Sequence, residues 1–217
     1  ADQAINEAKM QISNGPTNGY LLSAQSGNTG GLTWAAAPSS TWTKIETLTV
    51  SGTPSSVTSG AVFSATYANY VAVIRNFRVS TNGGLGLRLS ATGGSAVTSG
   101  YKWAGSGAEG GQGAGLITGS ASDGEIELLG GTNSSYHVNS TQDCLFAVIY
   151  FGNPYNGSRT QVQWNVSWEN ATDLDPHINT GGAHPNTQGS YDKFILLPNT
   201  GNFTTTTIID TYGISHA

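Results

Sequence analysis

The sequence predicts an all-β protein. We expect an antiparallel, jelly-roll-like β-sandwich over residues 41–217, preceded over residues 1–40 by an extended collar segment that includes a short helix. Three observations predict this class: short apolar or β-branched runs recur between turn signals, the signals lie about 8 to 12 residues apart, and no helical period runs through the larger part. One domain of about 200 residues is a common size for a sandwich.

Small polar residues dominate the composition, yet we expect the chain to fold. Only 10% of the residues are charged, the net charge is −5, and 5 Trp, 9 Tyr and 6 Phe are present. Disorder usually goes with few aromatic residues and a high net charge, which is the opposite pattern. So few charges also give little repulsion between copies, which favours homo-oligomers.

The same composition argues against two kinds of partner. Eight Lys and Arg residues in a net-negative chain offer no electrostatic footprint for nucleic acid. No apolar run reaches the 18 residues of a membrane-spanning helix, so we expect no membrane insertion.

Residues 1–12 predict a short helix or a strap against a neighbouring chain. Ile5 and Ile12 are seven residues apart, Ala8 lies between them on the same helical face, and Asp2 could cap the first turn. A single heptad is too short to hold as an isolated coiled coil. A stalk end, a strap and a frayed terminus therefore all fit this segment.

Residues 14–37 contain two glycine turns, and the large apolar side chains of this segment lie in residues 20–22 and 32–34. Asn18-Gly19 and Gly30-Gly31 tolerate the positive φ angles of tight turns. The short runs beside them can pair as strands but cannot build a core alone, so something else must cover their side chains. We expect this cover to come from copies of the chain, at interface residues Ile5, Ile12, Tyr20, Leu22, Leu32 and Trp34.

This segment resembles the collar of bacteriophage tail fibres, in which an NG-x-x-L … G-x-L-x-W pattern precedes a β-rich end domain. The resemblance continues in residues 85–90, 99–103 and 212–214, which look like end domains of marine and cyanobacterial phage fibres. It implies a homotrimer on the virion surface. A typical fibre carries a long stalk before the collar, whereas about twelve residues precede it here. Both a distal fragment and a complete short protein fit this length, and Ala1 suits a first residue after removal of an initiator Met.

The larger part contains a series of predicted strands. Residues 85–89 place three leucines on one face, and residues 161–168 place Val162, Trp164, Val166 and Trp168 on one face. The continuous apolar run at residues 144–151 predicts a central strand, and Asp123-Gly124 is a hairpin signal before residues 125–128. The other predicted strands cover residues 45–50, 61–66, 70–74, 77–80, 193–197, 203–209 and 211–214. The Gly-rich or weakly apolar segments 104–121 and 169–190 are expected to be loops, and loops at one end of a sandwich often carry function.

No catalytic or metal-binding residues are predicted, and we expect no cofactor. Glu169, Asp173, Asp175 and His177, with His184 nearby, could offer oxygen and imidazole ligands to a cation. The full calcium-loop pattern is missing, however, and a solvated loop explains these residues adequately. No nucleophile with a recognisable base occurs, and 13 acidic residues are a small pool for the paired carboxylates of sugar hydrolysis.

Aromatic residues in loop-like stretches predict a binding function instead. Exposed Tyr and Trp side chains stack on sugar faces and anchor protein contacts at little entropic cost. We expect Tyr101, Trp103, Tyr136 and Tyr155 to contact a host surface glycan or protein, with core or interface packing as the alternative for Trp103.

Two functions from different classes fit these features. The first is a non-enzymatic, trimeric phage fibre protein that binds a host receptor. The second is a capsid decoration protein that stabilises the phage head. In both, residues 1–40 contact other virion proteins, of the tail or of the capsid. A glycan depolymerase is a third reading, but it needs an acid pair that the sequence does not identify.

Overall fold

A computed structural model describes residues 12, 14–27, 30–36, 41–109, 116–129, 138, 145–169, 175–204 and 207–215. The chain forms two compact units, Ala1–Ser40 and Thr41–Ala217. Within the described ranges the chain forms antiparallel β-sheets and no helix. The helix expected at residues 1–12 lies outside them, apart from Ile12.

The first unit contains a β-hairpin of β1 (Tyr20–Ala24) and β2 (Leu32–Ala36). Leu22 lies opposite Trp34 in the register, and the Gln25 amide donates to the Gly31 carbonyl at 2.9 Å to close the loop. Gly19, Gly30 and Gly31 have φ angles of 84°, 84° and 71°. The expectation that both glycine pairs adopt positive φ is confirmed at Gly19 and at Gly30-Gly31.

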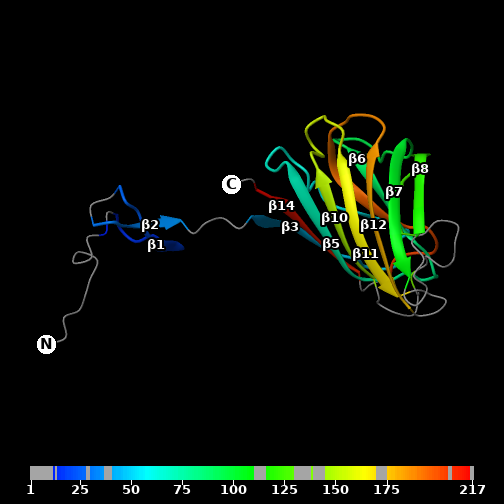
Figure 1. The fold of residues 1–217 in the computed structure, drawn as a ribbon, viewed down its shortest axis with the longest axis horizontal. Coiled ribbons are helices and arrows are strands. Elements are labelled where there is room, and N and C mark those ends of the chain that lie inside the picture. The colour runs from blue at the N-terminus through cyan, green and yellow to red at the C-terminus, as the bar shows by residue number, and fades with distance from the viewer. Residues whose placement is uncertain are drawn as a thin grey trace. The chain divides into compact units, whose positions relative to one another are not determined.

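The second unit is a β-sandwich of two unequal antiparallel sheets (Figure 1). The large sheet has the order β3-β14-β5-β10-β11-β12-β7-β8. Its strands are, in chain order, β3 (Trp42–Thr49), β5 (Asn69–Phe77), β7 (Tyr101–Glu109), β8 (Leu116–Asp123), β10 (Leu145–Gly152), β11 (Gln161–Glu169), β12 (Pro176–Pro185) and β14 (Ile208–Ile214). The first and last strands of the unit are therefore neighbours.

The small sheet has the order β4-β13-β6-β9. Its strands are β4 (Val57–Thr58), β6 (Leu85–Ala91), β9 (Ile126–Leu129) and β13 (Tyr191–Pro198). Contacts cross between the sheets: Phe151 of β10 stacks on Phe194 of β13 with ring centroids 5.4 Å apart, and the Leu89 amide of β6 donates to the Tyr101 hydroxyl of β7 at 2.8 Å. One apolar core lies between them.

Several strand predictions are confirmed. All four even-numbered residues of β11 from Val162 to Trp168 are buried, and Leu85, Leu87 and Leu89 of β6 are fully buried. β10 lies in the middle of the large sheet. Alternating side chains on a strand point to opposite faces, so the period of two in the sequence was sufficient to orient these strands.

Other predictions are wrong. Residues 104–121 and 169–190, expected to be loops, hold most of β7, β8 and β12. Residues 61–66 form no strand, and in residues 203–209 the strand begins only at Ile208. Asp123-Gly124 joins β8 of the large sheet to β9 of the small one, so it is a crossover between sheets instead of a hairpin.

Glycines in β7 and β12 make room for a tryptophan. Gly105 and Gly181 are paired in the register, and a Cβ added at Gly181 would overlap the Trp164 ring and come within 2.5 Å of the Ala104 carbonyl oxygen. The Trp164 side chain is fully buried on the inner face. A high glycine content suggested loops in the sequence, but here Gly105 and Gly181 lie inside two strands, where the absence of a side chain is needed for packing.

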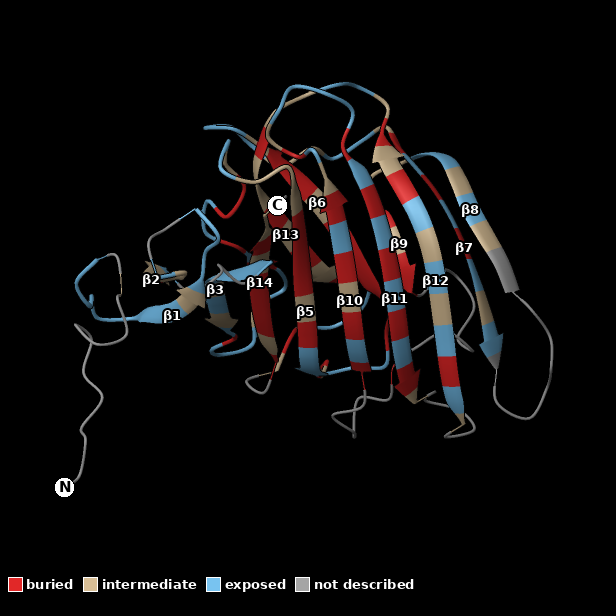
Figure 2. Ribbon diagram, turned by 60° about the vertical axis from the view of Figure 1, so that its left-hand side comes forward, coloured by how far each residue is buried: buried red, intermediate tan, exposed pale blue. Residues whose placement is uncertain are grey.

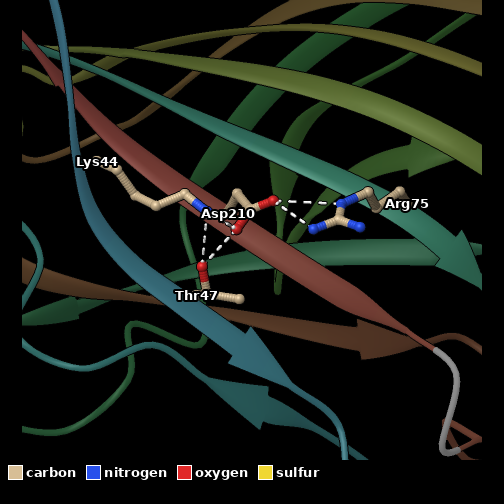
Figure 3. A network of polar contacts seen from close by, with 4 residues as sticks. All are labelled: Lys44, Thr47, Arg75 and Asp210. Atoms are coloured by element: carbon tan, nitrogen blue, oxygen red, sulfur yellow. Dashed lines mark hydrogen bonds and ion pairs between the residues drawn. The ribbon is translucent and has the colours of Figure 1, made fainter.

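A charged network ties the edge strand β3 to its neighbours (Figure 3). Asp210 of β14 receives ion pairs from Lys44 and Arg75, both at 2.8 Å, and a hydrogen bond from the Thr47 hydroxyl at 2.6 Å. Burial by itself raises the pKa of Asp210, but the bonds from Lys44, Thr47 and Arg75 outweigh burial and hold the pKa below its ordinary value. The network joins β3, β14 and β5 on the outer face of the large sheet.

Candidate ligand-binding groove

Along β10 and β11 of the large sheet, side chains alternate between the core and the outer face, and the more exposed residues lie on the outer face. Figure 2 shows buried and exposed residues alternating along β10 and β11. Where Val162 and Trp164 point into the core, Gln161 and Gln163 point outward, and on β10 Tyr150 points outward between buried Ile149 and Phe151. Cross-strand pairing then places Tyr150, Gln163, Gly182 and Ala104 in one row across β10, β11, β12 and β7.

Small side chains on part of this face leave a depression in the surface. The outward positions of β12 and β7 are occupied by Thr180, Gly182, Ala104 and Ser106. A groove of about 1140 Å³ lies over them. It is lined by Asn69, Tyr70, Lys102, Trp103, Ala104, Gly105, Ser106, Ser120, Tyr150, Phe151, Gly152, Gln161, Val162, Gln163, Thr180, Gly181, Gly182, Ala183, His184 and Ile214.

The groove offers one exposed aromatic ring and several uncommitted polar groups. Tyr150 is 41% exposed and is not engaged in a ring contact with another described residue. Within the described residues, the side-chain amides of Gln161 and Gln163 have no hydrogen-bond partner and are exposed. The Thr180 hydroxyl already donates to the Trp164 carbonyl at 3.0 Å. The groove can therefore stack a flat apolar face and exchange hydrogen bonds with a ligand.

Among its described residues the lining does not contain the paired carboxylates of sugar hydrolysis. Among the described residues that line the groove there is no carboxylate, and Lys102 is the one Lys or Arg. The carboxylates of Glu125 and Glu127 belong to the β9 region outside the lining, where burial raises the pKa of both. The Arg88 guanidinium, 3.1 Å from Glu125, opposes that rise for Glu125.

The two histidines considered for a cation lie on opposite faces of β12. His177 is buried on the inner face of β12 with its ring centroid 5.3 Å from that of Trp168, whereas His184 lies on the outer face. Asp173 lies outside the described residues. In the described part of the chain, no three His, Cys, Asp or Glu side chains are placed to hold a metal ion.

The predicted aromatic residues do not form the exposed cluster we expected. Tyr101 is fully buried, and besides accepting from Leu89 its hydroxyl donates to the Val97 carbonyl at 3.2 Å. Trp103 is 8% exposed and its indole donates to Asp123 at 3.2 Å. Tyr155 is half-buried against the core, and Tyr136 lies outside the described residues. For Tyr101 the expected exposure is wrong, and for Trp103 the alternative of core packing is confirmed, because Tyr101, Trp103 and Gly105 of β7 face the core.

Sequence reasoning missed Tyr150, Gln161 and Gln163. The signal for the two glutamines was present, because they alternate with the Val and Trp residues that the sequence places on one face of the strand. The outward orientation of Tyr150 could not be predicted, because the run of residues 144–151 is continuously apolar and shows no alternation that distinguishes the two faces of β10. Only the register places these three residues in one groove.

The hairpin of the first unit exposes an apolar face. The register puts Tyr20, Leu22, Leu32 and Trp34 on the same face of β1 and β2. Tyr20 and Leu22 are 40% and 39% exposed, while Leu32 and Trp34 are half-buried. Asn14 supports β2 from the side, because its carboxamide oxygen accepts from the Trp34 amide at 2.7 Å. Ile12 forms a bridge to Leu32, and Ile5 lies outside the described residues.

Within the described ranges no segment has both the helical length and the apolar character that a membrane crossing requires. Comparison of the chain with protein-family models, with curated proteins and with solved structures finds no match.

Proposed function

We propose that this chain is a non-enzymatic virion protein, a phage fibre subunit that trimerises through its hairpin unit and contacts the host surface through its sandwich. The observation that carries the proposal is the shared apolar face of Tyr20, Leu22, Leu32 and Trp34. A two-stranded hairpin is marginal in water by itself, so this face needs a cover. The phage collar resemblance favours two further copies of the chain as that cover.

The remaining interface residues extend the same surface. Ile12 is bridged to Leu32 and so continues the hairpin toward the N-terminus. In the proposal, Ile5 adds a further apolar contact near the end of a stalk. Residues 1–40 also attach the trimer to other virion proteins.

The sandwich supplies the binding surface in this proposal. We take it to be jelly-roll-like, which is supported by its two antiparallel sheets of unequal size and by the pairing of its first and last strands. A groove without carboxylates suits recognition better than hydrolysis, which needs an acid pair. No cofactor is needed for this role.

Labelling of intact phage particles tests the proposal. An antibody against residues 41–217 should label the tail, and the purified full-length chain should compete with particles for adsorption to host cells. Labelling of the head would favour the alternative, a capsid decoration protein whose hairpin face binds capsid subunits. Particles that carry no label at all would contradict both functions.

A further inference from the structure

We propose that the groove on the outer face of the large sheet binds a neutral oligosaccharide, with the Tyr150 ring against a sugar face and the Gln161 and Gln163 amides bonded to hydroxyl groups. The inference rests on the proposed function only in taking the chain to be a binding protein. It assigns the ligand class and the residues, which differ from the aromatic set that the sequence suggested.

The shape of the groove fits an extended, flat ligand. The row Tyr150, Gln163, Gly182 and Ala104 crosses four neighbouring strands. Three inter-strand steps span about 14 Å, since neighbouring strands lie roughly 4.8 Å apart. Beyond Tyr150 and Gln163 the side chains of this row rise little above the sheet, because Gly182 has no side chain and Ala104 has only a methyl group. A chain of sugar rings can lie across this floor.

Tyr150 is suited to stacking. It is exposed and lies on a central strand, where the flanking residues Ile149 and Phe151 are buried in the core. Aromatic rings supply a large apolar contact at a low cost in conformational entropy. The C–H groups on one face of a pyranose form such an apolar surface.

The amides complete the recognition of a neutral polar ligand. Each Gln side chain offers two N–H donors and a carbonyl acceptor, and a sugar hydroxyl can both donate and accept. Gln163 lies directly opposite Tyr150 in the register, and Gln161 is two residues away on the same face. A ligand on the Tyr150 ring is therefore within reach of amide groups that are not already bonded to described residues.

The sparse charge of the lining selects against strongly ionic ligands. Among the described lining residues Lys102 is the one Lys or Arg and there is no Asp or Glu. A cationic ligand has no carboxylate to pair with, and a polyanion has a single lysine. A neutral sugar chain needs neither.

The test uses the full-length chain on an array of neutral oligosaccharides, with separate arms of uronate-containing oligosaccharides and of unfolded peptides. The strongest neutral ligand is then titrated by calorimetry against the wild type and variants. We expect Tyr150→Ala and Gln163→Ala each to weaken binding about tenfold, which corresponds to about 1.4 kcal/mol.

Gly182→Leu is the sharpest variant, because it fills the groove without disturbing the core. A Cβ at Gly182 meets nothing closer than the Val162 carbonyl oxygen at 3.8 Å, and no positive φ is required there. Leucine also suits a strand better than glycine, so the melting temperature should not fall. Binding should be lost.

Matched controls lie on the same strands and the same face. Phe146→Ala on β10 removes an aromatic side chain that is 49% exposed but does not line the groove. Ser167→Ala on β11 removes an exposed polar group, also outside the lining. Both should bind the sugar like the wild type.

Three outcomes overturn the inference: no binding to any neutral oligosaccharide at millimolar concentration, binding confined to the uronate or peptide arms, or full affinity in Gly182→Leu. These outcomes are separable from failure of the proposed function. A chain that is trimeric and located on the tail but binds no sugar refutes the groove assignment alone.

Discussion

The hairpin unit and the sandwich differ in how they cover their apolar side chains. In the sandwich, Trp164, Leu87 and Phe194 are at most 1% exposed because two sheets of the same unit enclose them. In the hairpin, Tyr20 and Leu22 remain about 40% exposed on the described structure. Among the described residues of the first unit, no second sheet covers the two strands. The sandwich therefore contains its own core, whereas in our proposal the hairpin is covered by other copies of the chain.

Glycine serves two different purposes in this chain. Gly19, Gly30 and Gly31 adopt positive φ angles at turns, where the backbone conformation is the requirement. Gly105 and Gly181 lie in strands with ordinary φ, where the absent side chain is the requirement. The sandwich also has glycines with positive φ at turns, namely Gly52, Gly93, Gly100, Gly157 and Gly201. Glycine therefore marks turns in both units, and in the sandwich it also permits close packing.

The largest effect should come from the sandwich core. Trp164→Ala should lower the free energy of unfolding of the second unit by about 4 kcal/mol, because it empties the space under β7 and β12. Urea unfolding followed by far-UV circular dichroism measures it. A loss below about 1 kcal/mol would mean that the sandwich does not depend on its own packing as described.

Gly181→Ala should cost about 3 kcal/mol in the same measurement, because its Cβ would overlap the Trp164 ring and the β7 backbone. The neighbouring Gly182→Ala is the matched control, since its Cβ enters open space above the sheet. The control should be neutral or slightly stabilising. Equal costs for both variants would contradict the assignment of their faces.

Asp210→Asn should cost about 2 kcal/mol at neutral pH, because charged partners make stronger hydrogen bonds than neutral ones. The sign of the pH dependence follows from the lowered pKa of Asp210 in the folded state. Its contribution is present above the unfolded pKa of about 3.9 and is lost as the pH falls toward the lower folded pKa. The difference between wild type and variant should therefore be full at pH 7 and shrink below about pH 4. A difference that grows in acid would contradict the network.

The smallest effect on sandwich stability should come from the hairpin. Leu22→Ser should leave the unfolding of the second unit within about 0.5 kcal/mol of wild type but reduce self-association. Leu21→Ser is the matched control, because Leu21 is 54% exposed on the opposite face of β1. Analytical ultracentrifugation distinguishes them. Loss of association in both variants, or in neither, would contradict the shared face.

The alternation of side chains was enough to predict some parts of the fold. Val162 to Trp168 on β11 and the three leucines of β6 were oriented correctly because a period of two has a single physical reading on a strand. Leu22 and Trp34 were chosen as interface residues from the short runs beside the glycine turns, and the register then placed them on one face. These predictions needed only local information.

The rest depended on contacts between distant segments. β7 and β12 looked like loops because they are rich in glycine, but Gly105 and Gly181 are needed there to make room for Trp164, which lies on another strand. Tyr101 looked exposed because its cross-sheet bonds to Leu89 and Val97 cannot be read from its neighbours. The groove requires the register of four strands, so Tyr150 could not be associated with Gln163 before that register was known.

The central claim is that copies of this chain cover the apolar face of the hairpin. Light scattering on the purified full-length chain tests it most directly, with a variant lacking residues 1–40 alongside. We predict a particle of about 67 kDa, three times the 22.4 kDa of one chain, and a monomer when residues 1–40 are removed. A full-length particle of 22.4 kDa whose Tyr20 and Trp34 are well ordered by NMR would contradict the account.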